Sequence, residues 1–176
     1  MNQTHKKNWA AVLPDVLAPG LDVVFCGSAA GSASARAGAY YAGPGNRFWP
    51  ILHETGLTPH LVSPQAFQTV LDCRIGLTDM SKFQSGEDSE LKTEGDDAHA
   101  LARKIETYAP QALAFNGKRA ARVFFKEIVD APLDGYGLQA QRLGTTALFV
   151  LPSTSGAARR WWDASPWKAL AGFLAR

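Results

Sequence analysis

The chain has 176 residues, of which 46% are hydrophobic, and its formal net charge is +2. This length predicts one ordinary globular domain with a buried core, and so mild a charge excludes a histone-like polybasic binder. The longest apolar runs are too short to span a bilayer and the polar residues 1–7 lack a secretory signal, so we expect a cytoplasmic protein with no membrane partner.

The first half of the chain is predicted to open with a buried parallel strand at residues 21–27, after a Pro-Gly turn signal. A ligand would lie at the carboxyl end of this strand. The glycine-rich residues 28–45 are expected to form a functional loop. Asn46 fits the N-cap of a helix that ends near residue 54, and a second helix is expected at residues 64–71.

The second half is predicted to alternate strands and helices. Residues 76–94 read as a polar surface loop, and Asp96 and Asp97 start the clearest helix, which Pro110 ends. The later predicted elements are strand 112–115, turn 116–118, helix 119–129, strand 148–151, loop 152–158 and helix 165–175. This alternation predicts a three-layer α/β/α sandwich with a mainly parallel sheet. We assign the single domain residues 16–176 and treat residues 1–15 as an N-terminal extension.

Neither a metal nor an organic cofactor is predicted. The four histidines are scattered without paired ligand spacing, and the two cysteines have no CxxC spacing and fit buried thiols. The loop at residues 27–31 lacks both the glycine fingerprint of a dinucleotide site and the lysine of a phosphate loop.

Two segments beside strand ends are candidates for a functional site. The first is Gly43-Pro-Gly-Asn-Arg-Phe-Trp49, preceded by Tyr40-Tyr41, and the second is Leu151-Pro-Ser-Thr-Ser-Gly-Ala-Ala-Arg-Arg160. Taken singly, their residues also fit core aromatics, a helix cap and a plain strand-to-helix connection. The small residues of the second segment would let its backbone approach another molecule, with Arg159 and Arg160 available for phosphates.

Five motifs follow one another along nearly the whole chain. They are Leu17-Ala-Pro-Gly-Leu21, Val23-Val-Phe-Cys-Gly27, Asn46-Arg-Phe-Trp49, Ala114-Phe-Asn-Gly-Lys118 and Leu151-Pro-Ser-Thr-Ser-Gly156. Their order resembles that of the mismatch-specific uracil-DNA glycosylases, a branch of the uracil-DNA glycosylase superfamily. The resemblance implies a monofunctional DNA repair glycosylase that flips a deaminated base out of the DNA and hydrolyses its N-glycosidic bond, leaving an abasic site.

The resemblance also marks two departures from the family. The family's first strand ends in Gly-Ile-Asn-Pro-Gly, whose asparagine positions the attacking water. The matching residues here are Gly27-Ser-Ala-Ala-Gly31, which puts Ala29 at the asparagine position, and a methyl group cannot orient water. The family's strand-separating loop matches residues 153–159, where Ala157 replaces a bulky wedge and predicts weaker invasion of the duplex.

A carboxylate is predicted to replace the missing asparagine. Asp79 follows a presumed strand, and in the family's layout its loop borders the same pocket, where it would orient water and stabilise positive charge on the sugar. Asp79 fits a cap of the following turn about as well. Asp88, in a polar loop, is the alternative catalytic residue.

The other predicted site residues bind the substrate. Tyr41 takes the place of the family's aromatic residue that stacks beneath the flipped base. The predicted substrate-binding residues are Gly27, Ser28, Ala29, Tyr41 and Asn46. The predicted DNA-binding residues are Lys118, Ser155, Gly156, Ala157 and Arg159, and Arg119 and Lys82 are further candidates for a phosphate-binding face.

Two other functions stay open at this point. A non-catalytic binder of damaged DNA follows from Ala29 if Asp79 faces away from the pocket. A nucleotide-binding α/β protein unrelated to repair would show no salt-dependent affinity for DNA. For the glycosylase, uracil is the default base and hypoxanthine or xanthine the alternatives, in damaged or mismatched duplex or in single-stranded DNA. We expect a monomer.

Overall fold

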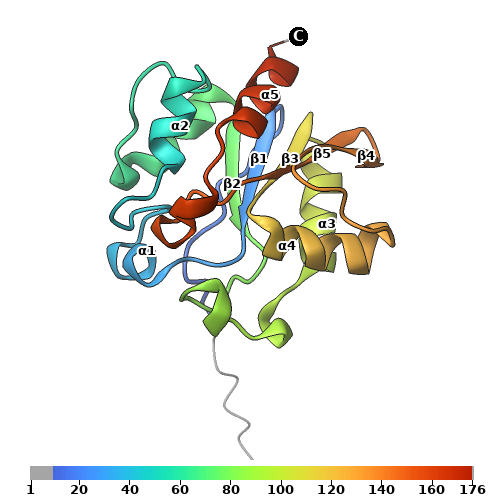
Figure 1. Ribbon diagram of the computed structural model, residues 1–176, viewed down its shortest axis with the longest axis horizontal. Helices are drawn as coiled ribbons and strands as arrows, with labels where there is room; N and C mark the ends of the chain where they lie inside the picture. Colours follow the sequence, from blue (N-terminus) through green and yellow to red (C-terminus); the bar gives the residue numbers. More distant parts are fainter. Residues whose placement is uncertain (1–9, 176) are drawn as a thin grey trace, which may run out of the picture.

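A five-stranded sheet with helices on both faces forms the centre of the molecule (Figure 1). The computed structural model describes residues 10–175. The strands lie in the order β2-β1-β3-β5-β4 and are β1 (Val23–Gly27), β2 (Ile75–Asp79), β3 (Ala112–Asn116), β4 (Gly137–Leu143) and β5 (Thr146–Leu151). All neighbouring pairs are parallel except β4 with β5. The predicted three-layer α/β/α sandwich with a mainly parallel sheet is confirmed.

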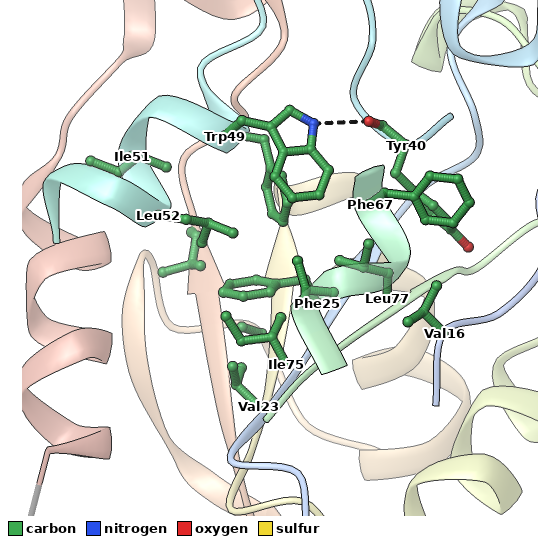
Figure 2. Close-up of a cluster of buried hydrophobic side chains, with 14 of the residues drawn as sticks. Val16, Val23, Phe25, Tyr40, Trp49, Ile51, Leu52, Phe67, Ile75 and Leu77 are labelled. Carbon is green, nitrogen blue, oxygen red and sulfur yellow. Dashed lines mark hydrogen bonds between the residues drawn. The ribbon is translucent and has the colours of Figure 1, made fainter. Parts of the chain in front are cut away.

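One face of the sheet is covered by α2 (Phe48–Glu54), the 3₁₀ helix η1 (Pro64–Cys73) and α5 (Ser165–Leu174). Side chains alternate across a strand, so Val23 and Phe25 of β1 point to this face. Figure 2 shows them packed with Ile75 and Leu77 of β2 beneath the α2 side chains. Each large side chain buried in this way contributes roughly 1.5–3 kcal/mol of transfer free energy.

The opposite face is covered by α3 (Ala98–Tyr108) and α4 (Lys118–Phe124). The alternate residues Val24 and Cys26 of β1 pack here against the apolar sides of both helices. After Phe124 the helix widens into a π-helical turn, η4 (Phe125–Val129). All five residues of β1, β2 and β3 are buried, which is the pattern of a parallel sheet sandwiched between helices.

The structure differs from the prediction in three elements. A short helix, α1 (Ser32–Ala37), lies inside the predicted loop 28–45, and the edge strand β4 was not predicted. The prediction of a surface loop from residue 76 was wrong for its first four residues, because they belong to the buried strand β2. The rest of that segment holds the single-turn helices η2 (Asp88–Glu90) and η3 (Thr93–Gly95).

The described part of the predicted N-terminal extension, residues 10–15, lies against the sheet. Leu13 is buried in the core, and Asp15 forms ion pairs with Lys82 at 2.8 Å and with Lys104 at 2.6 Å. Residues 1–9 lie outside the described part of the chain. Within residues 10–175 there is no helix long and apolar enough to cross a membrane.

The strand order creates a crevice at one edge of the sheet. From β1 the chain passes to its neighbour β2, and it then crosses over to β3 on the other side of β1. In open α/β sheets, ligands bind outside the carboxyl ends of the strands where the connections diverge in this way. The fold therefore places a binding site beyond the ends of β1 and β3.

Candidate functional site

A pocket of about 720 Å³ occupies this crevice. The four parallel strands end at this pocket. Its walls come from the loop after β1, the last residues of β2 and β3, and the loop after β5. The volume lies within the range of pockets that hold small organic molecules. A nucleotide unit is of suitable size for it.

Asp79 is the buried carboxylate of this pocket. It is the last residue of β2, lies opposite Gly27 of β1 and is only 6% exposed. Burial raises its pKa to about 6, against the opposing charge of Lys82. Lys82 is itself held by Asp15, and no hydrogen bond from residues 10–175 contributes to the pKa of Asp79. Its oxygens are therefore left available to a ligand or to water.

Gly27 makes room for the Asp79 carboxylate. A Cβ atom on Gly27 would lie 2.7 Å from Asp79 Oδ1 and 3.3 Å from the hydroxyl oxygen of Tyr41. The first distance is shorter than a real Cβ contact, so any side chain at this position would displace the carboxylate. Two oxygen atoms thus converge on the bare α-carbon at the end of β1.

Tyr41 is held by aromatic packing and by its backbone. Its ring stacks on the buried Phe48, with centroids 3.9 Å apart and planes at 26°. The preceding residue, Tyr40, accepts a hydrogen bond from Trp49 Nε1 at 3.0 Å, drawn in Figure 2. Tyr41 has a φ of 53°, a left-handed conformation that is uncommon for a bulky residue. Such strain is often found at functional sites.

The buried Tyr41 hydroxyl makes no well-formed hydrogen bond within residues 10–175, although the Asn116 side chain is near enough to lower its pKa. A buried hydroxyl without a partner costs free energy, so a ligand group that bonds to it would recover that cost. Burial and the charge of Asp79 raise its pKa, which keeps the hydroxyl protonated and able to donate.

Asn116 joins two walls of the pocket. It is the last residue of β3, and its amide nitrogen donates to Thr154 Oγ1 at 2.8 Å while its oxygen accepts from the Thr154 backbone N–H at 3.0 Å. Both side chains are buried. This pair of hydrogen bonds fixes the loop after β5 against the end of β3.

The loop after β1 is tied to the segment after β2. The carbonyl oxygen of Ser28 accepts from Ser81 N at 2.8 Å, and that of Ala30 accepts from Gly86 N at 3.0 Å. Ser28 is buried and Ala29 is half-buried, and both line the pocket. Asp88, a few residues beyond Gly86, lies exposed at the pocket mouth.

The pocket rim comes from the loops before α2 and after β5. The side-chain oxygen of Asn46 accepts from Phe48 N at 3.0 Å, so its amide N–H groups are the ones left for a ligand. Arg47, and not Asn46, is the N-cap residue of α2. A Cβ atom on Gly156 would lie 3.2 Å from the carbonyl oxygen of Pro44, so the two loops touch across the rim.

The structure brings most of the predicted site residues together. Those that line the pocket are Gly27, Ser28, Ala29, Tyr41, Asn46, Asp79, Asp88, Ser155, Gly156, Ala157 and Arg159. Lys118 does not line it, and its Nζ lies 4.3 Å from the centroid of the Tyr136 ring.

The two further basic candidates have acidic partners. Arg119 forms two 3.0 Å hydrogen bonds with Asp96, and Lys82 pairs with Asp15. Their charges are therefore largely neutralised, and neither is a free phosphate ligand. No group of three or more potential metal ligands occurs among the described residues.

Sequence reasoning missed several residues that line the pocket. Among them are Arg36, Asn116, Thr154 and Trp161. Asn116 was placed in a turn, and nothing in the sequence pairs it with Thr154. The Trp161-Trp162 doublet was a usable signal, because two successive tryptophans after a basic loop cannot both face the core of a helical turn.

The fold and the pocket define a class: an α/β protein with a nucleotide-sized site at the switch point of its sheet, where a buried carboxylate faces a stacked tyrosine. The family model of the uracil DNA glycosylase superfamily matches residues 14–171. The chain belongs to this superfamily. Membership supports a DNA glycosylase role, with DNA as the substrate.

A solved structure shares the fold. It is the solution NMR structure of a candidate uracil DNA glycosylase from Methanosarcina acetivorans, which is 24% identical in sequence. The match covers 96% of this chain and 99% of that chain, with a TM-score of 0.67. At this identity the similarity concerns the arrangement of helices and strands.

Proposed function

We propose that this protein is a monofunctional DNA glycosylase nearest the mismatch-specific branch, and that Asp79 takes the place of the usual asparagine. The substrate is a deaminated base, uracil by default. The observation that carries the proposal is the buried carboxylate of Asp79 in the pocket of a member of this superfamily. Its pKa is raised, and it has no hydrogen-bond partner among residues 10–175.

The first step is capture of an extruded nucleotide. Enzymes that act on a base take it out of the stack into a pocket and hold it by stacking and by hydrogen bonds. Tyr41 is supported from below by Phe48 and offers its ring for stacking. Asn46 and the backbone of Ser28 lie on the same pocket and are our candidates for reading the base edge.

The second step is hydrolysis at C1′ of the sugar. As the C1′–N bond breaks, the electron pair leaves with the base and positive charge grows on the sugar, where the carboxylate of Asp79 stabilises it. Water forms the new C1′–O bond and gives its proton to Asp79. The departing base anion takes up a proton from solvent and Asp79 releases its proton to solvent, so that the products are the free base and an abasic site. A carboxylate with a pKa near 6 is ionised at neutral pH and still basic enough for this role.

Asp79 is a better candidate than Asp88 because of its surroundings. Asp79 is buried between the ends of two strands, whereas Asp88 is exposed and lies on the single-turn helix η2. A charge is worth more in a site that excludes water than at a solvated surface. We therefore assign the catalytic role to Asp79.

The test is single-turnover excision from oligonucleotides that carry uracil, hypoxanthine or xanthine, both single-stranded and in duplex. Asp79→Asn keeps the size of the side chain and removes its basicity, and we expect the rate to fall about 100- to 10,000-fold. The matched control, Asp88→Asn, is expected to keep the rate within about threefold. DNA binding should survive in both variants.

The alternative function is a non-catalytic binder of damaged DNA, which Ala29 at the asparagine position favours. Wild-type protein that binds these oligonucleotides yet releases none of the three bases would replace our proposal with this one. Full activity in Asp79→Asn would leave a glycosylase but remove Asp79 from its mechanism.

A further inference from the structure

Trp161 lies at the rim of the pocket and makes no aromatic or cation–π contact with another residue of the described chain. Its side chain is 75% exposed, the highest value among the large hydrophobic residues of the described chain. It ends the short helix η5 (Gly156–Trp161) and lines the pocket together with Ala157 and Arg159. Burial of an exposed tryptophan side chain against a partner would gain more transfer free energy than burial of any other side chain in this loop.

The neighbouring Trp162, and not Trp161, packs this segment against the core. Trp162 is half-buried and packs against the core, with its ring centroid 6.2 Å from that of Trp167. The guanidinium of Arg47 lies 5.4 Å from the centroid of the Trp162 ring. Trp162 therefore anchors this segment, while Trp161 stays exposed at the pocket rim.

The loop that carries Trp161 is held at several points. Thr154 is bonded twice to Asn116, and its carbonyl oxygen accepts from Arg47 N at 2.9 Å. The Ser155 side chain caps η5 by accepting from Ala157 N. In Figure 1 this segment, drawn in red, lies beside the loop that carries α1. Because the loop is fixed, Trp161 meets a partner with little loss of conformational freedom.

Two arginines directly precede Trp161 in the loop. Arg159 and Arg160 are exposed, and neither forms an ion pair with an acidic residue in the described chain. Free guanidinium groups beside an exposed aromatic ring are the combination that binds nucleic acid, with phosphates on the cations and a base on the ring.

We propose that Trp161 stacks on a base of the duplex beside the extruded nucleotide and so holds open the gap that the nucleotide leaves. This inference rests on the proposed function, because it takes DNA as the ligand. It revises the expectation drawn from Ala157: the loop has lost a bulky side chain at that position but carries a larger one four residues later. Arg159 and Arg160 hold the flanking phosphates.

The experiment compares binding of wild type and Trp161→Ala to a duplex with a stable abasic analogue, to the intact duplex and to the single strand. For the abasic duplex we expect a loss of roughly tenfold or more, the size of one base–aromatic stacking interaction. The loss on the intact duplex should be smaller. Trp161→Phe should restore most of the affinity.

Two controls separate this role from a structural one. Leu61, 60% exposed and outside the pocket lining, is the matched residue, and Leu61→Ala should bind all three DNAs like wild type. Trp161→Ala removes no charge, so its salt dependence of binding should keep the wild-type slope.

The outcomes distinguish this inference from the proposed function. Equal affinity of wild type and Trp161→Ala for the abasic duplex would overturn the inference alone. Wild type that binds no DNA would overturn both. A third outcome is that Trp161→Ala binds the abasic duplex more weakly than wild type, yet wild type excises no base. This outcome would keep the Trp161 contact and remove the catalytic proposal.

Discussion

At the scale of single residues, Asp79 is costly to the fold. Its pKa is about 6 in the folded protein, against an ordinary value of 3.8, because burial disfavours the charged form. The folded state therefore holds the proton more tightly than the unfolded state. The contribution of this group to stability is highest below pH 3.8 and is lost as the pH rises through 6. Catalytic groups are commonly retained at such a cost.

The first prediction concerns the stability of Asp79→Asn. The neutral amide avoids the cost of a buried charge, so the variant should have a free energy of unfolding higher than wild type by up to about 3 kcal/mol at pH 8. At pH 5 the gain should be about half as large, because much of the wild-type carboxylate is then protonated in the folded state. Denaturant titrations at the two pH values measure the difference. A gain that does not depend on pH would show that the raised pKa is not its source.

Gly27→Ala is the second prediction. The added methyl would lie 2.7 Å from Asp79 Oδ1, and it would push the carboxylate away from the substrate. We expect at least a tenfold loss of excision rate, because misplacement by about an ångström is costly in catalysis. Gly172→Ala, whose new methyl meets nothing within 4 Å, is the control and should stay fully active. An unchanged rate in Gly27→Ala would show that the space above Gly27 is not needed to position the Asp79 carboxylate.

At the scale of elements, the pocket depends on how loops are fixed to strand ends. The loop after β5 is held by the Asn116–Thr154 pair, and the loop after β1 is held by the backbone of the segment after β2. Both attachments lie at the carboxyl edge of the sheet. The rigid sheet thereby positions residues that are far apart in the sequence.

The third prediction tests the attachment of the β5 loop. Asn116→Ala removes both hydrogen bonds and leaves the Thr154 N–H and hydroxyl unsatisfied in a buried place. The free energy of unfolding should fall by about 1–3 kcal/mol. DNA affinity should fall as well, because the loop bearing Arg159 and Trp161 is released. Chemical denaturation and a binding titration measure the two effects, and a stable variant with weakened binding would show that Asn116 acts on the loop alone.

The elements that could be predicted from the sequence are the ones with a strong apolar pattern. The strand that ends at Gly27 and the α3 helix are of this kind. The edge strand β4 was missed because only Gln139 in it is buried, so no apolar alternation marks it. Helix α1 was missed because Ser34 is its one buried residue.

The candidate site was predicted in part for a similar reason. The resemblance to the glycosylase family indicated Asp79 and Tyr41. The glycine-rich loop after β1 and the loop after β5 could be recognised from their places at strand ends, because the carboxyl ends of parallel strands meet at one edge. The pairing of Asn116 with Thr154 bridges 38 positions in the sequence and depends on tertiary packing. The contact of Lys118 with Tyr136 likewise follows from the path of the chain after α4.

At the scale of the whole molecule, the distribution of charge lets a protein of small net positive charge present unpaired cations to DNA. The formal net charge is only +2, yet Arg159 and Arg160 lie together beside the pocket without acidic partners in residues 10–175. Lys82, Lys104 and Arg119 are instead neutralised within the fold. Affinity for DNA should therefore come from a few phosphates near the rim.

The fourth prediction follows from this charge distribution. The logarithm of the binding constant should fall linearly with the logarithm of salt concentration, with a shallow slope. Replacing Arg159 and Arg160 together by glutamine should reduce the slope by about 2, one for each phosphate contact. Arg103→Gln, on the exposed side of α3, should leave the slope unchanged. A slope of zero for wild type would point to a ligand other than DNA.

The most direct test of the account is the pH dependence of single-turnover uracil excision by wild type and Asp79→Asn. Since the carboxylate is the active form, the wild-type rate should rise with pH, reach half its maximum near pH 6 and level off above about pH 7. Asp79→Asn should be slow and lack this rise. A variant that retains the wild-type rate and the same profile would contradict the assignment of Asp79 as the group that replaces the asparagine.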